Sequence, residues 1–122
     1  MGRADQDWRW PDELDALVAA PVHHRLLLEN ALVRVLLTNI AAGETTAVHT
    51  HRWRNVQYIV RSSDFVRRDG EGRVVHDTRV DGGPPEPGTV HWSEPIPPHS
   101  LENVGAGELD VIMVELKPAG PA

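Results

Sequence analysis

This 122-residue chain contains no cysteine. Its absence excludes disulfides, thiolate nucleophiles and thiolate metal ligands. The only lysine is Lys117, close to the C-terminus, so a catalytic Schiff-base lysine is not expected. The sequence also lacks the G-x-S-x-G motif of serine hydrolases, the phosphate-binding P-loop and the dinucleotide-binding G-x-G-x-x-G motif. Candidate catalytic and metal-binding groups must therefore be side chains other than thiols and amines.

Long apolar runs and an excess of positive charge are missing too. No apolar run approaches 18 residues, so no membrane-spanning helix is expected. The formal net charge of −6 argues against nucleic acid or an anionic membrane as a partner. The first ten residues are polar and aromatic, without the apolar stretch of a secretory signal, so we expect a cytoplasmic location. With 40% apolar and 25% charged residues, the chain is typical of one soluble globular domain.

Short strands dominate the predicted secondary structure. Residues 11–20 predict one short helix, because Pro11 and two acids favour its start and Pro21 ends it. Turn residues then separate short strand-like segments, and Asp69–Gly72 predicts a hairpin. Many short strands at this spacing predict an all-β sandwich, barrel or jelly roll. The expected strands are Leu26–Glu29, Val33–Ile40, Thr45–Thr50, Val56–Arg61, Asp64–Arg68, Arg73–Asp77, Thr89–Trp92, Ser100–Val104 and Leu109–Leu116.

A histidine pair is the clearest indication of chemistry. His49 and His51 are separated by one residue, so on a strand both imidazoles fall on one face. His99 follows a proline-rich turn whose fixed φ angles stiffen it, and it can complete a facial set. Imidazole suits zinc, copper, iron and nickel, and three ligands leave coordination positions open for chemistry. We therefore predict that His49, His51 and His99 bind a metal.

Around these histidines the sequence resembles the cupin superfamily. Its first motif, G-x5-H-x-H-x3-E-x6-G, is matched by Gly43, His49 and His51, with Asn55 at the glutamate position. Ser62 replaces the closing glycine of that motif. The second motif, G-x5-P-x-G-x2-H-x3-N, is matched at Gly88, His99 and Asn103, while Glu94 and Ile96 replace its proline and second glycine.

The resemblance implies a double-stranded β-helix (jelly-roll) barrel with a metal inside its mouth. The expected organisation is an N-terminal extension with a short helix over residues 1–24, a barrel over 25–118 and a tail over 119–122. Small cupins commonly pair through sheet edges or exchanged terminal strands, so a homodimer is expected. Asn103 is expected to hold backbone rather than to bind metal.

The asparagine at the glutamate position bears on the type of site. A neutral amide is a poor substitute for a carboxylate ligand, so a three-histidine centre is the simpler interpretation of Asn55. Losing the carboxylate leaves the metal more positive, which favours an anionic chelating substrate. Gln57 shares the inward face with Asn55 on a regular strand, where it can orient a metal-bound water or substrate.

Other candidates are weighed against ordinary structural roles. Tyr58 and Glu94 are candidate proton-transfer groups beside Gln57, although an exposed turn carboxylate is the simpler role for Glu94. For the aromatic residues, the alternative to a place in the pocket is core packing. For the arginines, the alternative is an exposed position on the surface. The candidate pocket residues are Trp53, Trp92, Arg34 and Asn55. His23 and His24 follow the predicted helix, where cations are favourable, and are interpreted as structural.

Three functions remain open from the sequence. The first is a dioxygenase with one divalent transition metal, preferably Fe(II), acting on a small anionic or dicarbonyl substrate. The second is a redox-neutral isomerase or lyase in which Zn, Mn or Ni acts as a Lewis acid. Cu is a further possible metal for the site. The third is a non-catalytic module that binds a small molecule. Because no candidate proton-transfer residue is compelling, the dioxygenase is favoured.

Overall fold

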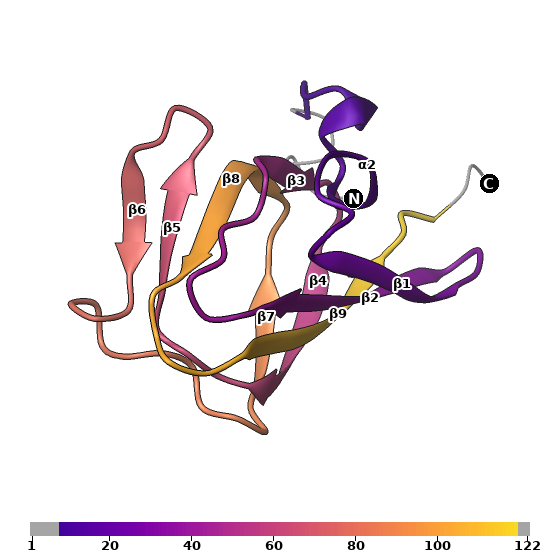
Figure 1. Ribbon diagram of the computed structural model, residues 1–122. Coiled ribbons are helices and arrows are strands. Elements are labelled where there is room, and N and C mark those ends of the chain that lie inside the picture. The colour runs from indigo at the N-terminus through magenta and orange to yellow at the C-terminus, as the bar shows by residue number, and fades with distance from the viewer. Residues whose placement is uncertain (1–7, 120–122) are drawn as a thin grey trace.

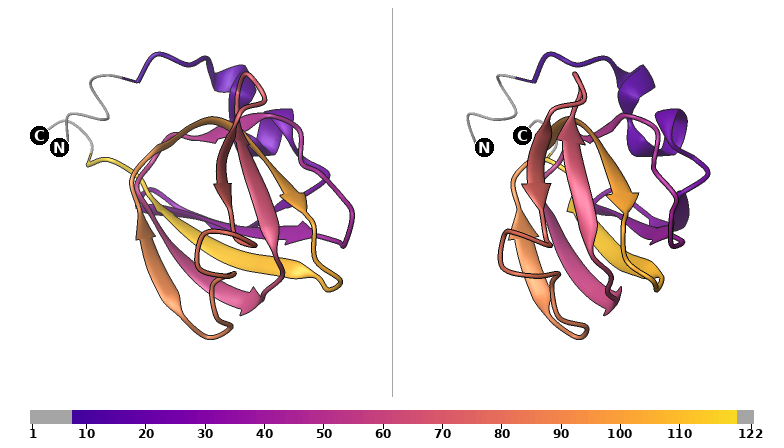
Figure 2. Two further views of the ribbon diagram at one scale, coloured as in Figure 1. Left: turned by 90° about the vertical axis from the view of Figure 1, so that its left-hand side faces the viewer. Right: turned by 60° about the vertical axis from the view of Figure 1, so that its left-hand side comes forward.

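The computed structural model describes residues 8–119, which form two antiparallel sheets facing each other (Figures 1 and 2). The strands are β1 (His24–Glu29), β2 (Val33–Ile40), β3 (His49–His51), β4 (Asn55–Arg61), β5 (Phe65–Asp69), β6 (Val74–Asp77), β7 (Val90–Ser93), β8 (Ile96–Asn103) and β9 (Leu109–Leu116). One sheet has the order β1-β2-β9-β4-β7 and the other β3-β8-β5-β6. The predicted all-β fold is therefore confirmed.

The predicted helix is wrong in length. Instead of one helix over residues 11–20, the chain forms a 3-10 turn, η1 (Asp12–Leu14), and one short α-helical turn, α2 (Ala16–Ala19). Asp15 interrupts them with an extended ψ of 143°. Its side chain accepts a hydrogen bond from the backbone N–H of Leu17 and binds Arg34. Tertiary contacts of one residue thus override the local helix signal.

Three predicted strands also have clearly different limits. β3 is confined to His49–His51, and residues 45–48 contribute only an isolated bridge between Thr45 and Glu102. β8 begins at Ile96, before the predicted start at Ser100, and passes through two prolines. β1 begins at His24, which lies inside the predicted N-terminal extension. The Asp69–Gly72 hairpin is confirmed, and Gly72 supplies its positive φ of 86°.

The Asn103 side chain, at the end of β8, forms hydrogen bonds with backbone groups of neighbouring segments, as expected from the sequence. Its amide donates to the carbonyl oxygens of Ile40 and Gly107, and its Oδ1 accepts from Ser63 Oγ and the Gly105 N–H. All four bonds satisfy a side chain that is fully buried. Among residues 8–119, no helix has the length and apolar character needed to cross a bilayer.

Candidate metal centre

Four histidines converge between the two sheets. β3 delivers His49 and His51, and His99 of β8 lies directly opposite His49 in the antiparallel register. His24, the first residue of β1, completes the group. One ligand atom from each of His24, His49 and His51 lies within 4.8 Å of the others. The ring of His99 is centred 4.4 Å from that of His49 and 5.6 Å from that of His51.

The same nitrogen is hydrogen-bonded in all four imidazoles. Nδ1 of His24 contacts the carbonyl oxygen of Ala20 at 2.9 Å, and Nδ1 of His49 contacts that of Ala47 at 2.7 Å. Nδ1 of His99 contacts the Pro97 carbonyl at 2.8 Å. A carbonyl oxygen only accepts, so Nδ1 carries the proton and Nε2 keeps its lone pair. In each histidine the nitrogen left free is therefore ready to bind a metal.

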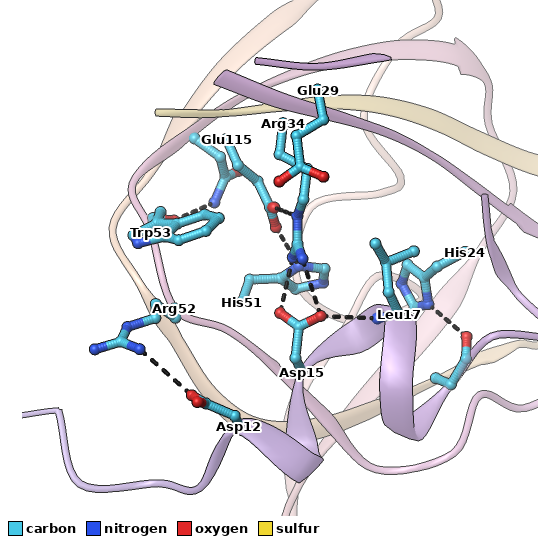
Figure 3. A network of polar contacts seen from close by, with 12 residues as sticks. Asp12, Asp15, Leu17, His24, Glu29, Arg34, His51, Arg52, Trp53 and Glu115 are labelled. Carbon is cyan, nitrogen blue, oxygen red and sulfur yellow. Dashed lines mark hydrogen bonds and ion pairs between the residues drawn. The ribbon is translucent and has the colours of Figure 1, made fainter. Parts of the chain in front are cut away.

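His51 is oriented by a carboxylate instead of a carbonyl. Its Nδ1 donates to Glu115 Oε2 at 3.0 Å, and Glu115 Oε1 accepts from Arg34 Nε at 2.6 Å. Arg34 in turn donates through both terminal nitrogens to Asp15, at 2.8 and 3.1 Å (Figure 3). This chain runs from the N-terminal segment to the metal-facing imidazole, and such carboxylate–histidine pairs typically fix ligand orientation.

Burial keeps most of this group neutral. Burial first, then the neighbouring histidine charges, lowers the pKa of His24 to about 4. Burial and the charge of His51 lower the pKa of His99 to about 3, and the same kind of causes shift the pKa of His49 far downward. Arg34 shows the opposite result: burial opposes its charge, but its hydrogen bonds with Asp15 and Glu115 raise its pKa. Neutral imidazoles near pH 7 are the form that binds metal.

The imidazoles face an apolar cavity between the sheets. Its empty volume, including the open mouth, is about 600 Å³. Besides the four histidines, Gln57 and Arg67 are its main polar groups, with Thr38 and Thr46. The apolar walls include Ile40, Ile59, Phe65, Leu101, Leu109 and Met113. Within residues 8–119, no carboxylate, tyrosine or lysine side chain lines this cavity.

The structure brings some of the predicted site residues together. His49, His51 and His99 line one cavity with ring centres 4.4 to 5.6 Å apart, and Gln57 lines it too. The ligand atoms that lie within 4.8 Å of one another, however, belong to His24, His49 and His51, so His24 takes the place predicted for His99 in that set. Gln57 donates to Asn55 Oδ1 at 3.0 Å, and Asn55 donates to the Trp53 carbonyl at 3.2 Å. Asn55 is thus fully buried and fixes the amide of Gln57 from outside the cavity lining.

Other predicted site residues lie elsewhere. Tyr58 follows Gln57 on β4, so strand alternation turns it outward, where it is 44% exposed. Trp92 is 58% exposed, and its indole N–H donates to Glu94, which also accepts from Arg54. Neither Trp92 nor Glu94 reaches the cavity, which argues against their proposed roles.

Arg34 and Trp53 lie behind the histidines rather than in the pocket. The Arg34 guanidinium carbon is 5.2 Å from the ring centre of Trp53, and both of its neighbours in the chain of ion pairs are acids of this protein. Arg34 therefore serves as part of the support for His51, because its donors are already occupied.

Sequence reasoning missed His24, Glu115 and Arg67. His24 was interpreted as structural because the apolar strand pattern starts only at Leu26. Its inward position follows from the pairing of His24 with Thr38 of β2, and both residues line the cavity. Glu115 directly follows the apolar run Val111–Val114 of β9, and a charged residue at that place is a signal present in the sequence.

Similar solved structures are cupins. A cupin domain from Bordetella pertussis superposes with a TM-score of 0.64 at 18% identity, covering 78% of this chain and 92% of that one. An RmlC-like cupin from Methanocaldococcus jannaschii gives 0.56 at 12% identity over 76% of this chain and 77% of that one. The polyketide cyclase RemF from Streptomyces resistomycificus gives 0.53 at 16% identity over 80% and 66%.

No family model and no curated protein sequence matches this chain. At these identities the likeness shows the fold, and it agrees with the motifs at His49, His51 and His99 and with the two-sheet topology. The chain therefore has the double-stranded β-helix fold of the cupins, with a histidine cluster suited to a metal ion inside it.

Proposed function

We propose that this protein is a metal-dependent cupin oxygenase that acts on a small anionic or dicarbonyl compound. The observation that carries the proposal is the shared arrangement of His24, His49, His51 and His99: each Nδ1 is engaged and each Nε2 is free at one end of an apolar cavity. Four imidazole nitrogen donors without a cysteine suit iron(II), zinc, nickel, manganese or copper.

The side chains around the cavity favour oxygen chemistry. When bound, iron(II) supplies electron transfer to dioxygen, which the side chains do not provide. The residues do the rest: the apolar walls exclude water, and the fixed amide of Gln57 orients a polar substrate group. Because no carboxylate or tyrosine among the described residues lines the cavity, a reaction that needs neither as a proton carrier fits best.

A redox-neutral isomerase or lyase is the second candidate, and one observation favours it. Three histidines are enough to hold a metal, so the fourth imidazole, which burial keeps neutral, remains able to accept a proton. In that case the proton acceptor is His24 or His99, whose rings are centred 4.5 and 4.4 Å from that of His49. A non-catalytic binding module requires the same site without turnover.

Metal content and oxygen uptake distinguish these functions. Untagged protein is loaded anaerobically with Fe(II), Mn(II), Ni(II) or Zn(II), and bound metal is counted in wild type, in His24→Ala and in the double variant His49→Ala/His99→Ala. We expect one metal per chain, lost in the double variant, and oxygen uptake by the iron form with a 1,3-dicarbonyl or 2-oxo acid. The exposed His91→Ala is the matched control.

Turnover by the zinc form without oxygen would support the isomerase instead, and ligand binding without turnover would support the binding module. A wild type that takes up none of these metals would rule out the metalloenzyme altogether.

A further inference from the structure

Arg67 is a cation inside the cavity with no partner in the described chain. It lies at the centre of β5, opposite Leu101 of β8 and His76 of β6, and its side chain lines the same cavity as the four histidines. Its Nε is buried without a hydrogen-bond partner. Among residues 8–119, no carboxylate forms an ion pair with the Arg67 guanidinium.

Other arginines of the same region are paired. Arg68, the next residue on β5, donates to Glu102 at 2.9 Å, and Arg34 is held by Asp15 and Glu115. Leaving a buried charge uncompensated is expensive, because desolvation is not repaid by an opposite charge. Burial accordingly lowers the pKa of Arg67. The fold thus retains an unpaired guanidinium in the cavity, and a bound anion would compensate it.

The position of Arg67 makes it accessible to a ligand. Phe65, Arg67 and Pro85 line the inner cavity and also a hollow outside it, which Val75 and His76 share. Asp81 borders that hollow, but its carboxylate accepts from the Asp77 N–H and lies 3.6 Å from His76 Nδ1. Arg67 therefore stands where the inner cavity meets the outside.

We infer that Arg67 anchors the carboxylate of a small organic acid whose second oxygen donor faces the histidine cluster. A guanidinium binds a carboxylate through two parallel N–H···O bonds, which gives both orientation and charge compensation. The proposed substrate class thereby narrows from anionic or dicarbonyl compounds to carbonyl-bearing carboxylates. This inference rests on the proposed function for the role of the histidines, but the anchoring itself is testable without metal.

Binding of matched probes tests the anchor. Pyruvate and acetoacetate are compared with pyruvamide and acetoacetamide, which keep the shape and the carbonyl but lose the charge. Calorimetry is performed on Ni(II)-loaded and on metal-free protein. We expect wild type to prefer each acid over its amide by at least about tenfold, as expected for a charge-assisted pair. Arg67→Met should abolish that preference, and Arg67→Lys should restore part of it because lysine keeps the charge without the fork.

Arg68→Met is the matched control, since Arg68 is on the same strand but pairs with Glu102 outside the cavity. It should bind the acids as wild type does, and nickel content should be unchanged in all of these variants. If wild type takes up no nickel but still prefers the acids over the amides, the proposed function is contradicted and the role of Arg67 as an anchor is supported. An acid preference that is absent from wild type, or that survives in Arg67→Met, would overturn the anchor.

Thermal stability gives a test that needs no ligand. Methionine has a similar length and no charge to desolvate, so Arg67→Met should raise the melting temperature of the ligand-free protein by roughly 5 °C. Arg34→Met should lower the melting temperature, because Asp15 and Glu115 lose the cation that pairs with them. A fall in the Arg67→Met melting temperature similar to that of Arg34→Met would mean that Arg67 is a structural residue.

Discussion

At the scale of single residues, the orientation of His51 depends on Glu115. This carboxylate has no exposed surface and bridges Arg34 and the His51 imidazole (Figure 3). Glu115→Gln keeps the shape but removes the charge that holds the Nδ1 proton in place. We expect metal affinity to fall about ten- to a hundredfold, as for other carboxylate partners of metal-binding histidines. Competition with a coloured chelator measures this change.

The control for Glu115 is Glu71→Gln. Glu71 also pairs with an arginine, Arg73, but the pair is exposed in the β5–β6 hairpin and contributes little. The Glu71→Gln variant should bind metal with the same affinity as wild type. Equal affinities in Glu115→Gln and wild type would show that the carboxylate does not tune the centre.

The buried histidines also predict how stability changes with pH. In the folded protein the pKa of His24 is about 4 and the pKa of His99 is about 3. In the unfolded chain both histidines have the ordinary pKa of 6.5. Below pH 6.5 the unfolded chain therefore binds protons that the folded chain does not, and the free energy of unfolding decreases as pH falls. From pH 6.5 to 5 we expect a loss on the order of 2 kcal/mol per histidine.

Urea titrations of metal-free protein between pH 7 and 5 measure this loss. Carboxylates with lowered pKa, such as Asp69, lose their contribution only below their ordinary value of 3.8, outside that window. His24→Gln should make stability less dependent on pH, whereas the exposed His91→Gln should not. Stability that is constant from pH 7 to 5 would contradict the neutral, buried state of these histidines.

At the scale of elements, the N-terminal η1–α2 segment is fastened to the barrel by Asp15. Asp15 caps α2 through the Leu17 N–H, pairs with Arg34 and forms a bridge with Thr50 beside the histidines. Asp15→Ala removes the cap and one of the two acids on Arg34, so it should destabilise the protein by about 2–4 kcal/mol.

Chemical denaturation of Asp15→Ala measures this effect, and Asp12→Ala is its control. Asp12 is exposed and meets Arg52 only at 3.4 Å, so its loss should change stability by less than about 0.5 kcal/mol. If both variants are equally stable, the segment is not held by the Asp15–Arg34 pair.

The elements also show what the sequence could predict. Strands such as β2 and β9 have the predicted limits of 33–40 and 109–116, because apolar, β-branched-rich runs bounded by turn residues are a local signal. β3 has no such pattern: His49, Thr50 and His51 are all buried, and a register shift separates the two histidines in their pairing with β8. Its short extent depends on that pairing, which local sequence does not encode.

The same distinction applies to the histidines. His49, His51 and His99 were predictable because they fall within two motifs of fixed spacing. His24 lies outside both motifs and reaches the centre only through the β1–β2 register. The outward position of Tyr58 already follows from alternation, because Asn55 and Gln57 are predicted to face inward on the same strand. The position of Trp92 depends on its pairing with Val56 of β4, a register that local sequence does not encode.

At the scale of the whole molecule, one cavity with apolar walls holds two kinds of polar group. Four imidazoles and the unpaired Arg67 line it, although the chain as a whole carries a net charge of −6. The acids of the described chain lie outside the cavity lining. An anionic substrate is therefore repelled by the general surface and attracted at one point, which favours selection at the mouth.

The outer edge of the five-stranded sheet predicts a homodimer. Within residues 8–119, β1 pairs with β2 alone and lies outermost in that sheet, so no described strand covers its other backbone edge (Figure 1). Leu26, Leu27 and Leu28 are 44%, 43% and 51% exposed, an apolar edge that a monomer rarely leaves uncovered. Two copies related by a two-fold axis would cover each other's leucines.

Light scattering after size exclusion tests this expectation. Wild type should show twice the 13.5 kDa mass of one chain, and Leu27→Arg should show the mass of one chain. Val90→Arg is the matched control, because Val90 is an exposed apolar residue of β7, the opposite edge of the same sheet. A monomeric wild type would contradict the dimer, and dissociation by Val90→Arg alone would move the interface to β7. Because His24 begins β1, a dimer through this strand would also hold one ligand of the candidate metal centre in place, so Leu27→Arg should bind metal more weakly as well.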